Sequence, residues 1–128
     1  MQGNPSVLVV DRSEETREVL TTALQRRGVQ TFWANRRGRG LELARRIHPD
    51  LIVLDLEVED DAPEAVYADF AGQSPSQETP LVLLGSARRG PQGTCWGEFV
   101  SKPYHYGPLI RRIEELLGTI KPVADSSS

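Results

Sequence analysis

The chain has 128 residues, 38% of them hydrophobic, and a formal net charge of −3. This length supports one hydrophobic core but not two ordinary domains, so we expect a single domain over residues 1–120 and a flexible polar tail over 121–128. No apolar run is long enough to cross a bilayer and the chain start lacks signal-peptide features, which predicts a cytoplasmic protein. A single cysteine excludes an internal disulfide, and two distant histidines argue against a zinc site.

Charge is unevenly distributed along the chain. Residues 26–46 hold seven arginines and one acid, Glu42, whereas residues 57–64 are mostly acidic. The arginine cluster fits either a solvated face between two helices or a surface that attracts phosphate groups or an acidic partner. Aromatic residues are not interleaved with it in the manner of single-strand nucleic-acid binders, so we expect no direct binding to nucleic acid.

The first half of the chain reads as two strand–helix pairs. Val7–Val10 is an apolar run typical of a strand buried on both faces. The helix that follows takes Ser13 as its N-cap and stops before Gly28. Residues 29–34 ("VQTFWA") alternate more strongly, which predicts a strand nearer an edge, and a second helical pattern over residues 38–49 is closed by a proline.

The second half repeats the pattern with one irregularity. Leu51–Leu54 and Leu81–Leu84 are again apolar runs, separated by a weaker helix that opens at Pro63. Residues 85–97 contain four glycines and a proline, so the fourth helix should be short or irregular. A short strand at 98–101 ("EFVS") and a helix over 108–120 complete the series. The alternation predicts an α/β domain, with helices on both faces of a doubly wound, five-stranded parallel sheet.

Chemistry-bearing residues stand where the predicted strands end. Ligands of open parallel sheets collect at the carboxyl ends of the strands, so these residues should converge on one pocket. They are Asp11, Asp55, Gly85 with Ser86, and Lys102. Two carboxylates, a hydroxyl and an ammonium in this order suit an aspartyl-phosphate site, with a carboxylate nucleophile, a magnesium ion and groups that bind phosphoryl oxygens.

Four segments carry a resemblance to a known family. Over residues 5–120 the chain resembles the receiver domain of bacterial two-component response regulators, the CheY-like superfamily, in "VLVVD", "PDLIVLDLE", "TPLVLLGSA" and "FVSKPY". The resemblance implies the flavodoxin-like strand order 2-1-3-4-5 and a phosphorelay function, in which the domain accepts a phosphoryl group and signals by protein–protein contact. It also implies a partner that donates the group, either a sensor histidine kinase or a phosphotransfer protein.

The same resemblance implies a role for each matching residue. Asp55 would be the phospho-acceptor, and magnesium would be held by Asp11, Asp55 and the backbone carbonyl of Glu57. Lys102 would contact the phosphoryl group and precede a cis peptide bond at Pro103, and Phe99 would occupy the aromatic switch position.

Two positions depart from the family pattern. Arg12 stands where a second acid is usual, which should weaken magnesium binding, because Mg²⁺ depends on hard oxygen ligands and carboxylate charge. Alternatively, Arg12 pairs with Asp55 or Asp11 and takes the place of the metal. Gly85 falls at the usual switch hydroxyl position with Ser86 after it, although a shift of one residue would restore a hydroxyl there.

Three functions therefore stay open. The first is a receiver phosphorylated on Asp55, which is no enzyme beyond magnesium-assisted transfer to its own carboxylate. The second is a pseudo-receiver, a protein-binding module that works without phosphorylation, as Arg12 and Gly85 favour. The third is an aspartyl-phosphate phosphatase, which is disfavoured because Glu57 stands where such enzymes place a second aspartate and the chain has no room for a capping domain.

Overall fold

The computed structural model describes residues 4–58, 63–71, 79–86 and 97–120. Its elements in chain order are β1 (Ser6–Val10), α1 (Glu14–Arg26), β2 (Gln30–Ala34), α2 (Arg37–Ile47), β3 (Leu51–Asp55), α3 (Pro63–Ala71), β4 (Leu81–Gly85), β5 (Gly97–Ser101) and α4 (Tyr106–Ile120). The predicted tail at 121–128 lies outside the described residues, as do residues 87–96 of the segment 85–97 that was predicted to hold a short or irregular helix. The predicted division into a domain and a tail therefore stays a prediction.

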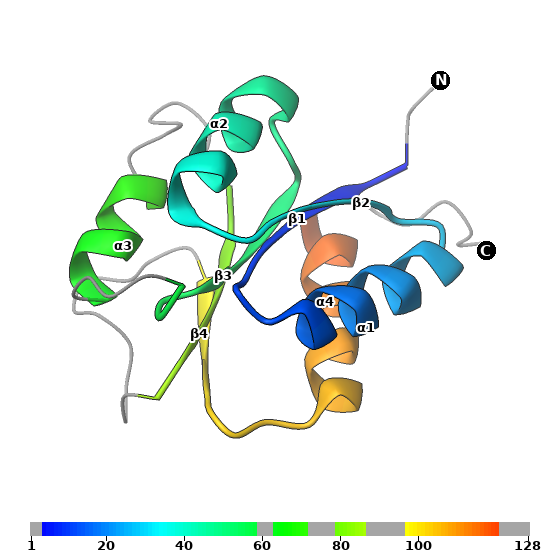
Figure 1. Cartoon of the computed structure of the whole chain (residues 1–128). Helices are drawn as coiled ribbons and strands as arrows, with labels where there is room; N and C mark the ends of the chain where they lie inside the picture. Colours follow the sequence, from blue (N-terminus) through cyan, green and yellow to red (C-terminus); the bar gives the residue numbers. More distant parts are fainter. Residues whose placement is uncertain (1–3, 59–62, 72–78, 87–96, 121–128) are drawn as a thin grey trace.

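All five strands form one parallel sheet in the order β2-β1-β3-β4-β5. This confirms the doubly wound, flavodoxin-like arrangement. Figure 1 shows α1 and α4 on one side of the sheet and α2 and α3 on the other. The carboxyl ends of the strands therefore meet along one edge, which is where the predicted site residues stand.

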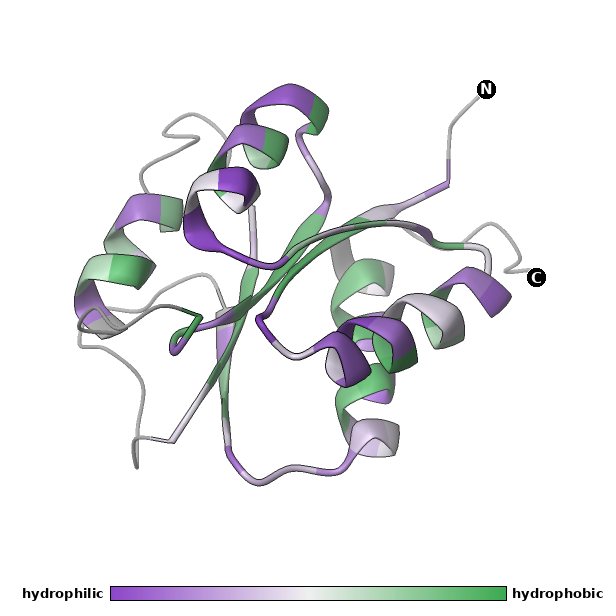
Figure 2. Cartoon of the chain, in the orientation of Figure 1, coloured by the Kyte–Doolittle hydropathy of each residue, from purple (hydrophilic) through white to green (hydrophobic). Residues whose placement is uncertain are grey.

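Each face of the sheet has its own apolar core. On the side of α1 and α4, Val7 and Val9 pack with Leu20, Leu24 and Ile113, all buried. The opposite side holds the alternate residues of the same strand together with side chains of α2 and α3. Figure 2 shows this division, with apolar residues along the strands and on the inner sides of the helices. Strands covered on both faces are apolar throughout, which explains their uninterrupted four-residue runs in the sequence.

The helix boundaries follow from local chemistry. The Ser13 hydroxyl accepts a hydrogen bond from the Thr16 N–H (3.2 Å) and caps α1, as predicted. Gly28 ends the turn after α1 with a φ of +84°, a conformation that glycine adopts without strain. In α2, a Cβ on Gly40 would lie 2.8 Å from a methyl group of Val10, so this glycine lets α2 pack closely on β1.

Candidate functional site

A pocket of about 770 Å³ opens at the carboxyl ends of β1, β3 and β5. It brings together most of the strand-end residues that the sequence singled out. Its lining is Asp11, Arg12, Ser13, Thr16, Asp55, Glu57, Ser86, Lys102, Pro103, Tyr104 and Tyr106. Gly85 and Phe99, both also predicted, lie next to the pocket and are not part of its lining.

Two buried carboxylates form the acidic half of the pocket. Asp11 follows β1 and is 3% exposed, and its Oδ1 accepts the Ser13 N–H (2.8 Å). Asp55 is the last residue of β3 and is 4% exposed. Burial raises the pKa of Asp11 to about 6; the Ser13 hydrogen bond opposes this shift, whereas the charge of Asp55 and a hydrogen bond to it add to it. This half of the pocket thus holds negative charge that is poorly compensated.

Lys102 supplies the positive charge of the pocket. It follows β5, where its N–H donates to the Gly85 carbonyl (2.8 Å), and the predicted cis peptide bond to Pro103 is present. Its Nζ donates to Asp55 Oδ1 (2.9 Å) and to Glu57 Oε1 (3.1 Å). Burial lowers the pKa of Lys102, but the hydrogen bonds and charges of Asp55 and Glu57 outweigh burial and raise it above its usual range. Lys102 is therefore a fixed cation between two carboxylates.

The Glu57 side chain is a site group that the sequence reasoning missed. Its N–H donates to Asp55 Oδ1 (2.9 Å). Its Oε2 accepts the Ser86 N–H (3.0 Å), while Oε1 accepts from Lys102. The hydrogen bond from the Ser86 side chain is the largest cause that lowers the pKa of Glu57. The sequence analysis assigned a role to the backbone carbonyl of Glu57 alone. An acidic residue two positions after the proposed acceptor was the signal that could have indicated the side chain as well.

The end of β4 presents a glycine, as the preferred register predicted. Gly85 pairs with Ser101 of β5, and Ser86 is the first residue beyond the strand. A Cβ on Gly85 would lie 3.4 Å from Phe99 Cε1, so the aromatic ring packs directly beside this glycine. Phe99 is half-buried and packs against the core on the α2 and α3 side. Gly85 itself offers no hydroxyl to the pocket, and the Ser86 hydroxyl is engaged with Glu57.

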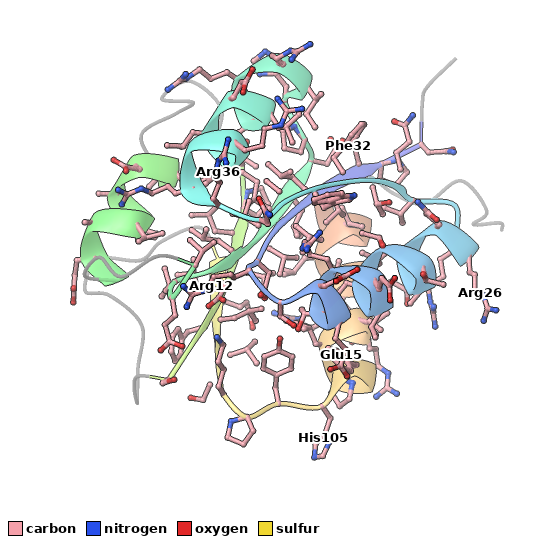
Figure 3. The ribbon with its side chains drawn as sticks, in the orientation of Figure 1. Arg12, Glu15, Arg26, Phe32, Arg36 and His105 are labelled. Carbon is pink, nitrogen blue, oxygen red and sulfur yellow. The ribbon has the colours of Figure 1, made fainter. Side chains whose placement is uncertain are left out.

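Arg12 does not replace a metal ion in the way that the sequence suggested. Its side chain is exposed on the turn from β1 into α1, where Figure 3 labels it. Among the described residues it forms no ion pair with Asp11 or Asp55; the cation bound to Asp55 is Lys102. The expectation of an Arg12–carboxylate pair is therefore wrong. An exposed guanidinium keeps its hydration, whereas Lys102 is fixed in place by β5.

Two tyrosines and a threonine form a wall of the pocket that the sequence reasoning also missed. The Tyr106 and Thr16 hydroxyls lie 3.1 Å apart, and the Tyr104 and Tyr106 rings meet edge to face with centroids 5.8 Å apart. Burial raises the pKa of Tyr104, which keeps this phenol protonated. The segment "KPYHY" carries the signal, but only its lysine and proline are predicted to belong to the site. The wall links the α1 start to the α4 start beside Asp11.

The donor set fits a weakly bound magnesium ion. Two buried carboxylates beside each other favour a dication, and the raised pKa of Asp11 reflects the cost of leaving their charge uncompensated. Mg²⁺ commonly binds through one or two carboxylates and keeps several waters. Within the described part of the chain no cluster of three or more acidic, histidine or cysteine side chains could hold a metal. Among the described residues the site therefore offers two carboxylates, without the third side-chain ligand of a tight site.

Comparisons with known proteins agree with this geometry. The polar-differentiation response regulator DivK of Brucella ovis is 25% identical over 119 residues, which cover 88% of this chain and 96% of DivK. The non-phosphorylated HemR receiver domain of Leptospira biflexa matches with a TM-score of 0.73 at 25% identity, over 88% of this chain and 94% of the HemR chain. The chemotaxis protein CheY4 of Vibrio cholerae gives a TM-score of 0.75 at 21% identity, over 90% of this chain and all of CheY4. The chain is thus similar to CheY-like receiver domains in sequence and in fold.

Three further results stand beside these similarities. The regulatory protein AtoC of Escherichia coli is 30% identical over 78 residues, which are 61% of this chain but only 16% of AtoC. No protein-family model matches the chain. In the described residues, no helix is long and apolar enough to span a membrane.

Proposed function

We propose that this response regulator receiver domain accepts a phosphoryl group on Asp55 and signals by contact with other proteins. The observation that carries the proposal is the surroundings of Asp55. Its carboxylate is buried at the end of β3, 2.9 Å from the ammonium group of Lys102 and beside Asp11. A positioned nucleophile with a fixed cation beside it is the arrangement that phosphoryl transfer to a carboxylate requires.

The proposed step leaves an acyl phosphate on Asp55. An Asp55 carboxylate oxygen attacks the phosphorus of a phosphohistidine, the P–N bond breaks, and its electron pair returns to the imidazole nitrogen. A magnesium ion held by Asp11, Asp55 and the Glu57 carbonyl would neutralise phosphoryl oxygens. Lys102 supplies a second positive charge, 2.9 Å from Asp55 Oδ1. The donor would be a sensor histidine kinase or a phosphotransfer protein, and the chemistry would be confined to the domain's own carboxylate, in the cytoplasm.

The arginine cluster gives no support to nucleic-acid contact. Arg39 and Arg46 both pair with Glu42, at 3.0 and 3.7 Å, and Arg37 pairs with Asp69 of α3 at 3.5 Å. These arginines are satisfied on the molecule's own surface, as expected of a solvated helix face. We therefore propose no direct role in binding nucleic acid.

A second candidate is a phosphorylation-independent pseudo-receiver that acts as a protein-binding module. Arg12 at the pocket and Gly85 at the switch position favour it, since one removes a metal ligand and the other a phosphate-binding hydroxyl. In this alternative, Asp55 and Lys102 form a static ion pair.

Incubation with acetyl phosphate and Mg²⁺, followed by intact-mass measurement, separates the two candidates. The proposal expects one phosphoryl adduct that needs Mg²⁺ and is absent from Asp55→Asn. Asp69→Asn, the same substitution on the exposed surface of α3, is the matched control and should be modified like the wild type. No adduct over a wide range of Mg²⁺ concentrations would overturn the proposal in favour of the pseudo-receiver.

A further inference from the structure

The pocket already contains an anion at its cationic end, and that anion belongs to the protein. The Glu57 carboxylate receives the Lys102 ammonium on Oε1 (3.1 Å) and the Ser86 N–H on Oε2 (3.0 Å). The Ser86 side chain adds a further hydrogen bond to this carboxylate. A lysine, a backbone N–H and a hydroxyl that converge on the oxygens of one anion make up a phosphate-binding set.

These donors are the ones that a phosphoryl group on Asp55 needs. Lys102 Nζ lies 2.9 Å from Asp55 Oδ1, so oxygens of a group attached to Asp55 come within reach of the same ammonium. The ammonium already divides its hydrogen bonds between Asp55 and Glu57. A dianionic phosphoryl group and the Glu57 carboxylate would repel each other if both stayed. The Glu57 carboxylate and the phosphoryl group therefore compete for the same position beside Lys102.

From this geometry we infer that the Glu57 carboxylate is the resident occupant of the phosphoryl subsite formed by Lys102 and Ser86. It mimics the phosphoryl group while Asp55 is unmodified, and it is displaced when Asp55 is phosphorylated. The inference deepens the proposed function and, for the displacement step, rests on it. Glu57 thus acts as a positioning residue, which holds Lys102 and Ser86 in place and competes with the incoming group.

Glu57 is suited to displacement in a way that the other carboxylates are not. Its side chain is 41% exposed, whereas that of Asp55 is 5% exposed. A carboxylate at the rim regains water when it swings out, so its release costs little. The same motion frees the Ser86 N–H and hydroxyl, which lets Ser86 supply the hydroxyl that Gly85 lacks.

The test compares the wild type with Glu57→Gln and Glu57→Ala in two measurements on the full chain. The first is the rate of adduct formation with acetyl phosphate and Mg²⁺. We expect both variants to react about two- to fivefold faster, because the exposed ion pair that competes for Lys102 is a weak one. The second is the Ser86 amide signal in ¹H–¹⁵N NMR without any phosphate. Loss of the charged acceptor should move this proton upfield and speed its exchange with solvent in Glu57→Ala.

Glu42→Gln is the matched control, since Glu42 is also an exposed, ion-paired glutamate but lies on α2. It should change neither measurement. An unchanged Ser86 signal in Glu57→Ala overturns the inference whatever the adduct rates are. A shifted Ser86 signal with adduct rates that do not rise overturns the displacement step. If no protein forms an adduct, the proposed function fails, while a shifted Ser86 signal still supports Glu57 as the resident anion.

Discussion

The pocket has an acidic half around Asp11 and a basic half around Lys102, and the two differ in how their charges are balanced. Around Asp11 a carboxylate is buried beside a second carboxylate, and its pKa rises to about 6. Around Lys102 each charge faces an opposite one, and the pKa of Glu57 falls while that of Lys102 rises. The charge of the acidic half therefore destabilises the fold, and a dication or a proton relieves this cost. In the basic half the charges already balance one another. The acidic half is therefore where a metal ion would relieve the most charge.

The largest expected effect is that Asp11→Asn stabilises the fold at neutral pH. An aspartate with a folded-state pKa of about 6 against 3.8 keeps its proton longer in the folded protein, so stability falls as pH rises from about 4 to 6. This shift corresponds to about 3 kcal/mol. Asparagine retains an oxygen for the Ser13 N–H and removes the charge. Urea unfolding in EDTA should show a higher free energy of unfolding for Asp11→Asn than for the wild type at pH 7.5, and no difference at pH 4.

Equal changes for Asp11→Asn at both pH values would contradict this account, since a packing effect does not depend on the carboxyl proton. Asp69→Asn, on the exposed surface, should leave stability within about 0.5 kcal/mol of the wild type at either pH.

Lys102→Met should lower the stability of the fold, whereas Asp11→Asn raises it. Without the lysine, the carboxylates on both sides of the pocket lack a bound cation. The methionine keeps the chain length but leaves Asp55 and Glu57 without their cation, and it removes the charge that lowers the pKa of Asp11. We expect a loss of about 1–2 kcal/mol at pH 7.5, since Lys102 is partly exposed, and a smaller loss at pH 4. Lys102→Arg keeps the charge and should lose less. A loss that is the same at both pH values would mean that packing of the lysine stem, not its charge, is what the fold needs.

The fold and three site residues could be predicted from the sequence for the same reason. The inner strands β1, β3 and β4 contain uninterrupted apolar runs and β5 a short one, so the residue that follows each run marks the ligand edge. Asp11, Asp55 and Lys102 were found in this way, and the structure places all three in one pocket. Their positions depend on strand ends, which the hydrophobic pattern fixes.

The rest of the site depends on where side chains point from turns, which no pattern along the chain records. Glu57 follows β3 and its carboxylate turns back to Lys102, where it also accepts the N–H of Ser86, the residue just after β4. Tyr106 reaches Thr16 across 90 residues of sequence. For Arg12, charge alone favoured a pair with Asp11 or Asp55, whereas in the structure the Arg12 side chain is exposed.

Arg12→Asp should strengthen Mg²⁺ binding at the acidic half of the pocket. It removes a positive charge at the pocket and adds a third carboxylate to the two described there, so Mg²⁺ affinity should rise roughly tenfold. Calorimetric titration with Mg²⁺ at pH 7.5 measures this directly. Arg12→Gln removes the guanidinium without adding a ligand and should give a smaller gain. Equal gains in the two variants would show that repulsion by Arg12, and not a missing ligand, limits the metal; no gain in either would show that the exposed guanidinium lies too far from the carboxylates to act on them.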